Sequence, residues 1–128
     1  MAETGRDPFI LGGNARALLH EILHALERLA EEGENTLIDL DRIPFGQDDE
    51  AMLKAVLGDG EISVTLDAMG VSHIRETGVR GVWIIEHLNG DKERIGRFIE
   101  VTRCPELLRT PGDDLKESCK ALKQRLDQ

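Results

Sequence analysis

An alternation of apolar and polar residues in the middle of the chain limits the fold more than any other feature. Ile62, Val64 and Leu66 alternate with polar residues, which is the pattern of a strand with one buried face. Three further strands are predicted at 72–77, 82–88 and 95–102. Asn89-Gly90 predicts a hairpin between the last two, because both residue types tolerate positive φ. The segment therefore predicts an antiparallel β-meander, with the 82–88 strand, apolar on both faces at its start, at the centre.

Amphipathic helices are predicted on both sides of this meander. Asn14 is a candidate N-cap for a helix that ends at Gly33. Its apolar stripe is Leu18, Leu19, Ile22, Leu23, Leu26, Leu29 and Ala30. A short strand at 36–40 and a helix at 48–57 follow, and a last helix begins at Asp113 with an apolar side formed by Leu115, Cys119, Leu122 and Leu126.

The predicted architecture is one α+β domain over residues 14–128, preceded by a flexible arm at 1–13. In this prediction the antiparallel β-meander packs with the N-terminal and C-terminal amphipathic helices. A chain of 128 residues fits one domain and is long enough to bury a core.

Charge and hydropathy exclude several classes of partner. The net charge of −9 argues against nucleic acid or an anionic membrane as the main partner. No apolar run approaches the 18 residues or so that would span a bilayer. Two cysteines do not make a disulfide scaffold, and they favour a reducing cytoplasm. Cys119 is predicted to be a small core residue, whereas Cys104, beside Pro105, is either structural or a reactive thiol.

The sharpest short motif lies on the first predicted helix. His20-Glu21-Ile22-Leu23-His24 matches H-E-x-x-H, in which two histidines bind zinc and the glutamate acts as a base. A zinc-dependent hydrolase is one interpretation. An ordinary solvated helix face is the other, because both histidines point about 150° away from the apolar stripe. In addition, Ala30 stands where the extended metzincin motif has its third histidine. No phosphate-binding or dinucleotide-binding glycine motif occurs, so no cofactor is predicted.

Unusually many polar residues fall within the predicted strands. They are Arg75, Glu76, Glu86, His87, Glu100, Thr102 and Arg103, with Trp83 among them. One interpretation is a solvated sheet face with cross-strand ion pairs. The other is a surface that binds a partner protein, with Trp83 either as its aromatic anchor or as a core residue. These eight residues are the predicted partner-binding set.

Three ordered segments resemble the HupH/HyaF family of hydrogenase expression proteins. Gly60-Glu61-Ile62-Ser63 resembles a G-E-V-S motif of the family. Ile74-Arg75-Glu76-Thr77, followed by residues 81–87, resembles the next motif. Residues 98–108 resemble the signature F-I-E-V-x-x-x-P-E-[IL]-L. The similarity covers about residues 15–125, and the longer family members carry more sequence than one such module.

The resemblance implies a role in the maturation of [NiFe] hydrogenases. Family members are regarded as chaperones or scaffolds, notably for the iron–sulfur small subunit before export, and not as enzymes. The expected partners are therefore that subunit or other maturation proteins, and the acidic groups would steer a basic targeting segment into contact. A generic dimerisation module that forms a homodimer through the sheet edge or the last helix is a further alternative.

Overall fold

The computed structural model describes residues 13–128, so the predicted arm at 1–13 lies, apart from Gly13, outside the described residues. The helices are α1 (Gly13–Glu32), α2 (Gln47–Leu57) and α3 (Gly112–Leu126), with short 3-10 helices η1 (Leu40–Arg42) and η2 (Glu106–Leu108). The strands are β1 (Thr36–Asp39), β2 (Ser63–Asp67), β3 (Val71–Glu76), β4 (Val82–Leu88) and β5 (Arg94–Val101).

The strands form one antiparallel sheet in the order β1-β5-β4-β3-β2. Strands β2 to β5 are the predicted meander, and β1 adds to its free edge, where Ile38 lies opposite Ile99. β4 is central and begins with four buried residues, as its apolar sequence predicts. The predicted α+β class is therefore confirmed.

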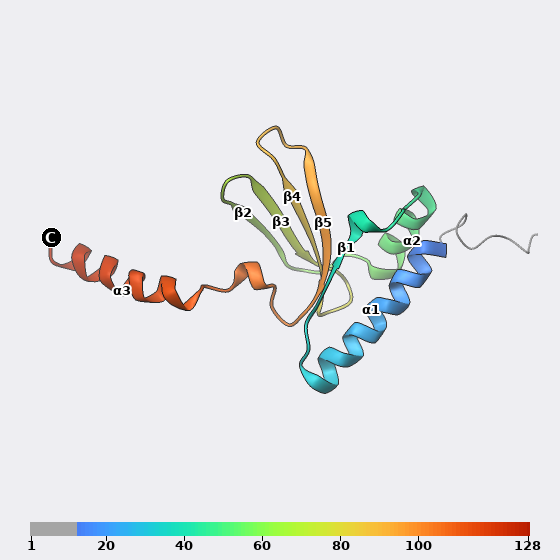
Figure 1. The fold of residues 1–128 in the computed structure, drawn as a ribbon, viewed down its shortest axis with the longest axis horizontal. Coiled ribbons are helices and arrows are strands. Elements are labelled where there is room, and N and C mark those ends of the chain that lie inside the picture. Colours follow the sequence, from blue (N-terminus) through green and yellow to red (C-terminus); the bar gives the residue numbers. More distant parts are fainter. Residues whose placement is uncertain (1–12) are drawn as a thin grey trace, which may run out of the picture.

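Two helices cover one face of the sheet and leave the other face open (Figure 1). α1 turns Leu18, Ile22 and Ala25 inward, and these pack with side chains from β1, β4 and β5 in the main core. α2 adds Leu53 and Leu57. A smaller apolar cluster on the opposite side of the sheet is formed by Ile74, Trp83 and Ile85, with Val64, Phe98 and Leu108 packed against it.

The N-terminus of α1 is capped from another helix rather than by Asn14. The helix begins at Gly13, and the Asn14 amide donates to the Pro44 carbonyl 2.7 Å away. Asp49, buried in the first turn of α2, accepts from the backbone N–H groups of Ala15 and Gly46, each at 3.0 Å. These N–H groups lower the pKa of Asp49, the Gly46 bond first, against the opposing effect of burial.

The β4–β5 hairpin is present, but its turn differs from the predicted two-residue form. The positive φ falls on Lys92, at 65°, rather than on Asn89 or Gly90. The Asn89 side chain accepts from the N–H groups of Asp91 and Glu93, and it holds the turn together. An asparagine at the start of a turn acts in this way because its side chain imitates a backbone carbonyl.

The C-terminal helix departs from the expectation that it closes the sheet. α3 extends away from the body on the side of the open sheet face (Figure 1), and none of its residues is buried. Cys119 is exposed, so the prediction that it is a core residue is wrong. A helical pattern of apolar residues predicts that one side of a helix packs, but it does not identify the surface that covers this side. Among residues 13–128, no helix is both long and apolar enough to cross a membrane.

Candidate functional site

The structure divides the predicted partner-binding set between the two faces of the sheet. Successive residues of a strand point to opposite faces. Arg75 and Glu86 therefore point to the side that the helices cover, where Arg75 pairs with Asp59 at 3.4 Å and Glu86 pairs with Arg94 at 3.5 Å. Both pairs are partly exposed and contribute little to stability.

The open face receives four residues of the set, namely Glu76, Trp83, His87 and Glu100. Glu76 lies opposite Trp83, and Trp83 lies opposite Glu100 in the next strand pair. The His87 ring shares a hydrogen bond of 2.7 Å with the Ser72 hydroxyl and meets Phe98 edge-on. Glu76, Trp83 and Glu100 form one row across the sheet, and His87 lies farther along β4, opposite Ser72 and Gly96. The binding role of the set stays a prediction.

Trp83 is a core residue rather than a surface anchor. It is 4% exposed, it packs in the smaller apolar cluster, and its indole N–H donates to the Thr102 carbonyl at 3.1 Å. Thr102 is buried too, and its hydroxyl bonds to the backbone of Cys104 at the turn after β5. Arg103 is exposed in that turn. Trp83 was a candidate for either a binding anchor or a core residue, and its burial supports the core role.

The two histidines of H-E-x-x-H lie on the exposed side of α1. His20 and His24 are both exposed, as the helical wheel predicts. Within residues 13–128 no group of three histidine, cysteine or acidic side chains is placed to hold a metal ion. The zinc interpretation therefore finds no third protein ligand in the described part of the chain.

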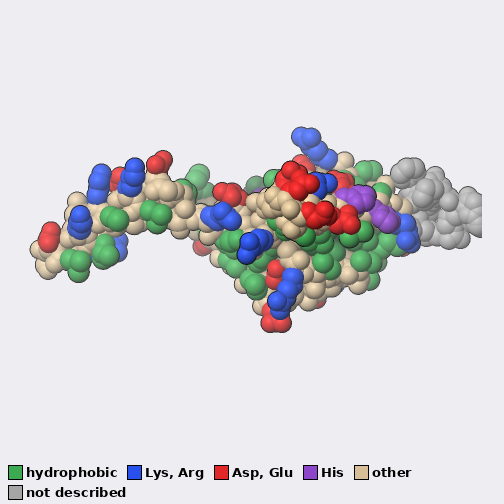
Figure 2. Space-filling view, turned by 90° about the horizontal axis from the view of Figure 1, so that it is seen from below, with side chains coloured by type: hydrophobic (Ala, Val, Ile, Leu, Met, Phe, Trp, Pro, Cys, Tyr) green, Lys and Arg blue, Asp and Glu red, His purple; other side chains and the backbone are tan. Residues whose placement is uncertain are grey.

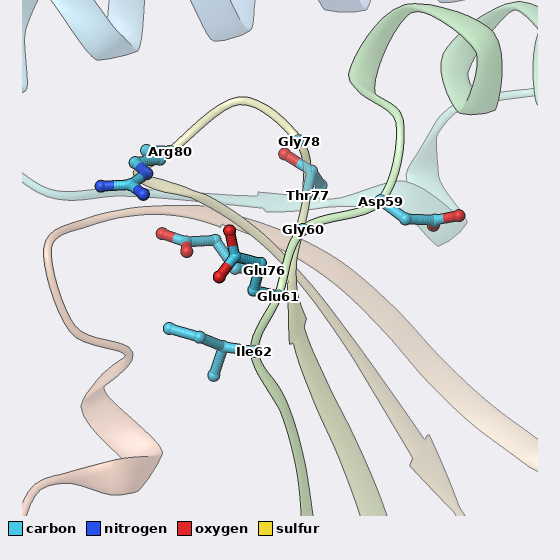
Figure 3. A pocket seen from close by; sticks show the side chains of 8 residues that line it. All are labelled: Asp59, Gly60, Glu61, Ile62, Glu76, Thr77, Gly78 and Arg80. Atoms are coloured by element: carbon cyan, nitrogen blue, oxygen red, sulfur yellow. The ribbon is translucent and has the colours of Figure 1, made fainter.

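A polar pocket of about 360 Å³ lies where two of the motif segments meet. Its walls are the segment 59–62 before β2 and the segment 76–80 between β3 and β4 (Figure 3). Gly60 donates to the Glu76 carbonyl, and Glu76 donates to the Ile62 carbonyl, so the backbones of the two segments are joined directly. We call this the corner pocket.

Three ionisable side chains give the corner pocket its chemistry. Glu61 and Glu76 extend to the same side as Arg80 in Figure 3, whereas Asp59 points away from them. The Glu76 carboxylate accepts from the Gly81 N–H at 3.1 Å, which fixes its position. Two carboxylates beside one guanidinium make a site for a polar or basic group, and the pocket holds no nucleophile paired with a base.

The glycines of this corner are required by close backbone contact. A Cβ on Gly60 would lie 2.4 Å from the Thr77 carbonyl oxygen, and a Cβ on Gly78 would lie 2.8 Å from that of Leu57. Both distances are too short for any other residue. The glycine of the G-E motif thus has a structural role, and it leaves the adjacent Glu61 side chain exposed at the pocket.

Sequence reasoning named only Glu76 among the residues that line this pocket. Glu61 belongs to a motif that supports the family resemblance, and Arg80 lies in a loop with no recognisable pattern. The hydrogen bonds that join the two segments are non-local, so the sequence carried no direct signal for them.

A second, more apolar pocket of about 240 Å³ lies on the open sheet face beside η2. We call it the sheet pocket, and it is lined by Leu37, Ile85, His87, Phe98, Glu100, Glu106 and Leu107. Glu100 is 8% exposed and accepts from the Glu106 N–H at 3.3 Å. Burial raises the pKa of the Glu100 carboxyl, and the negative charge of Glu106 adds to this effect.

Comparison with known proteins gives consistent matches. A family model described as "HupH hydrogenase expression protein, C-terminal conserved region" matches residues 13–128. The hydrogenase expression/formation protein HupQ of Azotobacter chroococcum is 29% identical over 113 residues, which are 87% of this chain and 40% of the relative. The hydrogenase-1 operon protein HyaF of Escherichia coli is 26% identical over 111 residues, 87% and 38% respectively.

A solved structure matches more closely. The hydrogenase expression protein HupH from Thiobacillus denitrificans is 43% identical, with a TM-score of 0.85 over 90% of this chain and 96% of that one. The chain spans about 40% of the length of the curated relatives named above. From the family match over residues 13–128 and this structural agreement, we conclude that the chain belongs to the family of HupH hydrogenase expression proteins, within their C-terminal conserved region.

Proposed function

We propose that this chain is a binding module in the maturation of a [NiFe] hydrogenase, and that it acts by holding an immature subunit rather than by catalysis. The family and the names of its relatives support the maturation role. The iron–sulfur small subunit is the partner we propose, as the resemblance implies. The cytoplasm is the proposed compartment, because the subunit would be held before export.

The observation that carries this proposal is the corner pocket. It is built from two family motif segments, and its lining includes the exposed Glu61 and the half-buried Glu76. Two neighbouring carboxylates suit a basic segment of a partner, and the net charge of −9 would attract such a segment from a distance. Of the predicted set, Glu76 lines the pocket, whereas Arg75 points to the opposite face of the sheet, where it pairs with Asp59.

Affinity capture from cells that express a [NiFe] hydrogenase tests the proposal. Tagged wild-type chain should recover a hydrogenase subunit, identified by mass spectrometry. The double substitution Glu61→Gln and Glu76→Gln should recover markedly less, because both pocket charges are removed while the hydrogen bond to Gly81 can still form.

A matched control is the double substitution Glu31→Gln and Glu32→Gln. It removes the same charge from two exposed residues in the last turn of α1 that do not line the pocket. Recovery with this control should equal that of the wild type. Capture of no hydrogenase subunit, or equal loss with both double variants, would contradict the proposed site.

A further inference from the structure

α3 carries an apolar seam that no other segment within residues 13–128 covers. Leu115, Leu122 and Leu126 are 55%, 57% and 74% exposed, and the exposed Cys119 lies between them. Their spacing of four, three and four residues places all four on one narrow side of the helix, the pattern of a packed helix–helix or helix–sheet seam. Figure 2 shows hydrophobic side chains gathered along one side of α3, with Lys and Arg side chains above them.

A helix of this length needs a packing surface. Isolated helices of about 12–15 residues are marginal in water, and most of the stability of a protein helix comes from its packed face. None of the 15 residues of α3 is buried by the described part of the chain. The seam is therefore expected to be covered by another surface.

The charges beside the seam indicate what that surface is. Lys116, Lys123 and Arg125 flank the apolar residues, so two α3 helices packed on each other would bring like charges together. The sheet pocket has the complementary character: Leu37, Phe98 and Leu107 offer apolar contact, and Glu100 and Glu106 are acidic. Leu37 and Leu107 are 62% and 46% exposed, so this surface is uncovered as well.

The chain's own α3 is directed away from this surface. Arg109 and Pro111 have extended backbone with ψ of 134° and 145°, so the link from η2 carries α3 outward (Figure 1). The length of α3 matches the width of the sheet. A helix of 15 residues is about 22 Å long, and five strands span about 19 Å.

We propose that two copies of this chain exchange their C-terminal helices, with α3 of each copy seated across the open sheet face of the other through its leucine seam. The contact is isologous, so both copies give a helix and receive one. Lys116, Lys123 and Arg125 would then face the acidic rim at Glu100 and Glu106 of the second copy. This inference does not depend on the maturation role, since it concerns the sheet pocket and not the corner pocket.

Light scattering coupled to size exclusion on the full chain tests the proposal. The wild type should have twice the chain mass of 14.2 kDa. Leu122→Lys should raise the dimer dissociation constant by about 30-fold or more, the loss typical of a buried anchor residue. Gln124→Lys adds the same charge on the exposed polar side of the helix and should leave the dimer intact.

A substitution on the open sheet face distinguishes the exchange of α3 helices from a dimer in which two α3 helices pack on each other. Leu37→Lys should weaken the dimer as Leu122→Lys does, whereas it would have no effect if α3 paired with α3. An equimolar mixture of the two variants should recover some dimer, because one of the two contacts is then intact. Far-UV circular dichroism of each variant should show a folded chain, since both leucines are exposed in the single copy.

Thiol labelling gives an independent measurement. Cys119 should react slowly with iodoacetamide in the wild-type dimer and rapidly in Leu122→Lys, as measured on the Cys119 peptide by mass spectrometry. A wild-type chain that is monomeric at 100 μM, or a Leu37→Lys variant that dimerises like the wild type, would overturn the proposal.

Discussion

Replacing Trp83 by alanine should destabilise the fold before it affects binding. The indole is 4% exposed, it packs with Ile74 and Ile85, and it donates to the Thr102 carbonyl. Removing a buried tryptophan side chain costs about 3–5 kcal/mol. For 128 residues the unfolding entropy is about 0.27 kcal/mol per kelvin, so the melting temperature should fall by about 11–19 °C. Thermal unfolding followed by circular dichroism measures this shift.

Two further substitutions complete the comparison, one that removes only the indole hydrogen bond and one at an exposed site as a control. Trp83→Phe keeps an aromatic ring but leaves the Thr102 carbonyl without its donor, and it should cost about 1–3 kcal/mol. Leu107→Ala, at a site that is 46% exposed, should change stability by less than about 1 kcal/mol. A Trp83→Ala protein that melts with the wild type and yet fails to capture its partner would refute the burial argument and make Trp83 a surface anchor.

Three further predictions concern buried polar groups and close backbone contacts. Asp49→Ala should lower the free energy of unfolding by about 2–5 kcal/mol in urea titrations, because the buried N–H of Ala15 and the partly buried N–H of Gly46 lose their acceptor. Since the folded-state pKa of Asp49 is lowered below its ordinary value of 3.8, the stability that it contributes is present above that pH and should be lost as the pH falls through the folded value. Glu100→Gln should raise the melting temperature at pH 7, and the difference should shrink as the pH falls towards the ordinary value of 4.5, since the raised folded-state pKa of Glu100 makes stability fall as the pH rises through it. Gly60→Ala should reduce stability in the same titrations, because its Cβ would meet the Thr77 carbonyl oxygen at 2.4 Å, whereas Gly90→Ala, with open space at the Cβ, should be tolerated.

The strands and helices could be predicted from local sequence because each shows a periodic pattern of apolar residues and ends at recognisable residues. The alternation at Ile62–Leu66 and the apolar start of β4 predicted two strands correctly, and Gly33 ends α1 with a φ of 71°, as a C-terminal glycine does. The pairing of β1 with β5 brings together residues about sixty positions apart, and no local pattern specifies such a partner.

The candidate site was less predictable, for reasons that differ between residues. Arg75 and Glu76 are neighbours in one strand, as are Glu86 and His87 in the next, and neighbours in a strand cannot share a face. The alternation of side chains along a strand is thus enough to divide the predicted set between two faces. The corner pocket, in contrast, depends on backbone hydrogen bonds between Gly60 and Glu76, which follow from the register of β2 on β3. The exposure of α3 could not be predicted either, because an amphipathic pattern does not identify the surface that covers it.

Direct binding of a purified hydrogenase small subunit, prepared without its iron–sulfur clusters, tests the central claim most directly. Isothermal titration at low and at moderate salt should give saturable binding to the wild-type chain. Binding should weaken as salt increases, and it should weaken further in the Glu61→Gln and Glu76→Gln double variant. Absence of binding at either salt concentration, or equal affinity of the double variant and the wild type, would contradict the account.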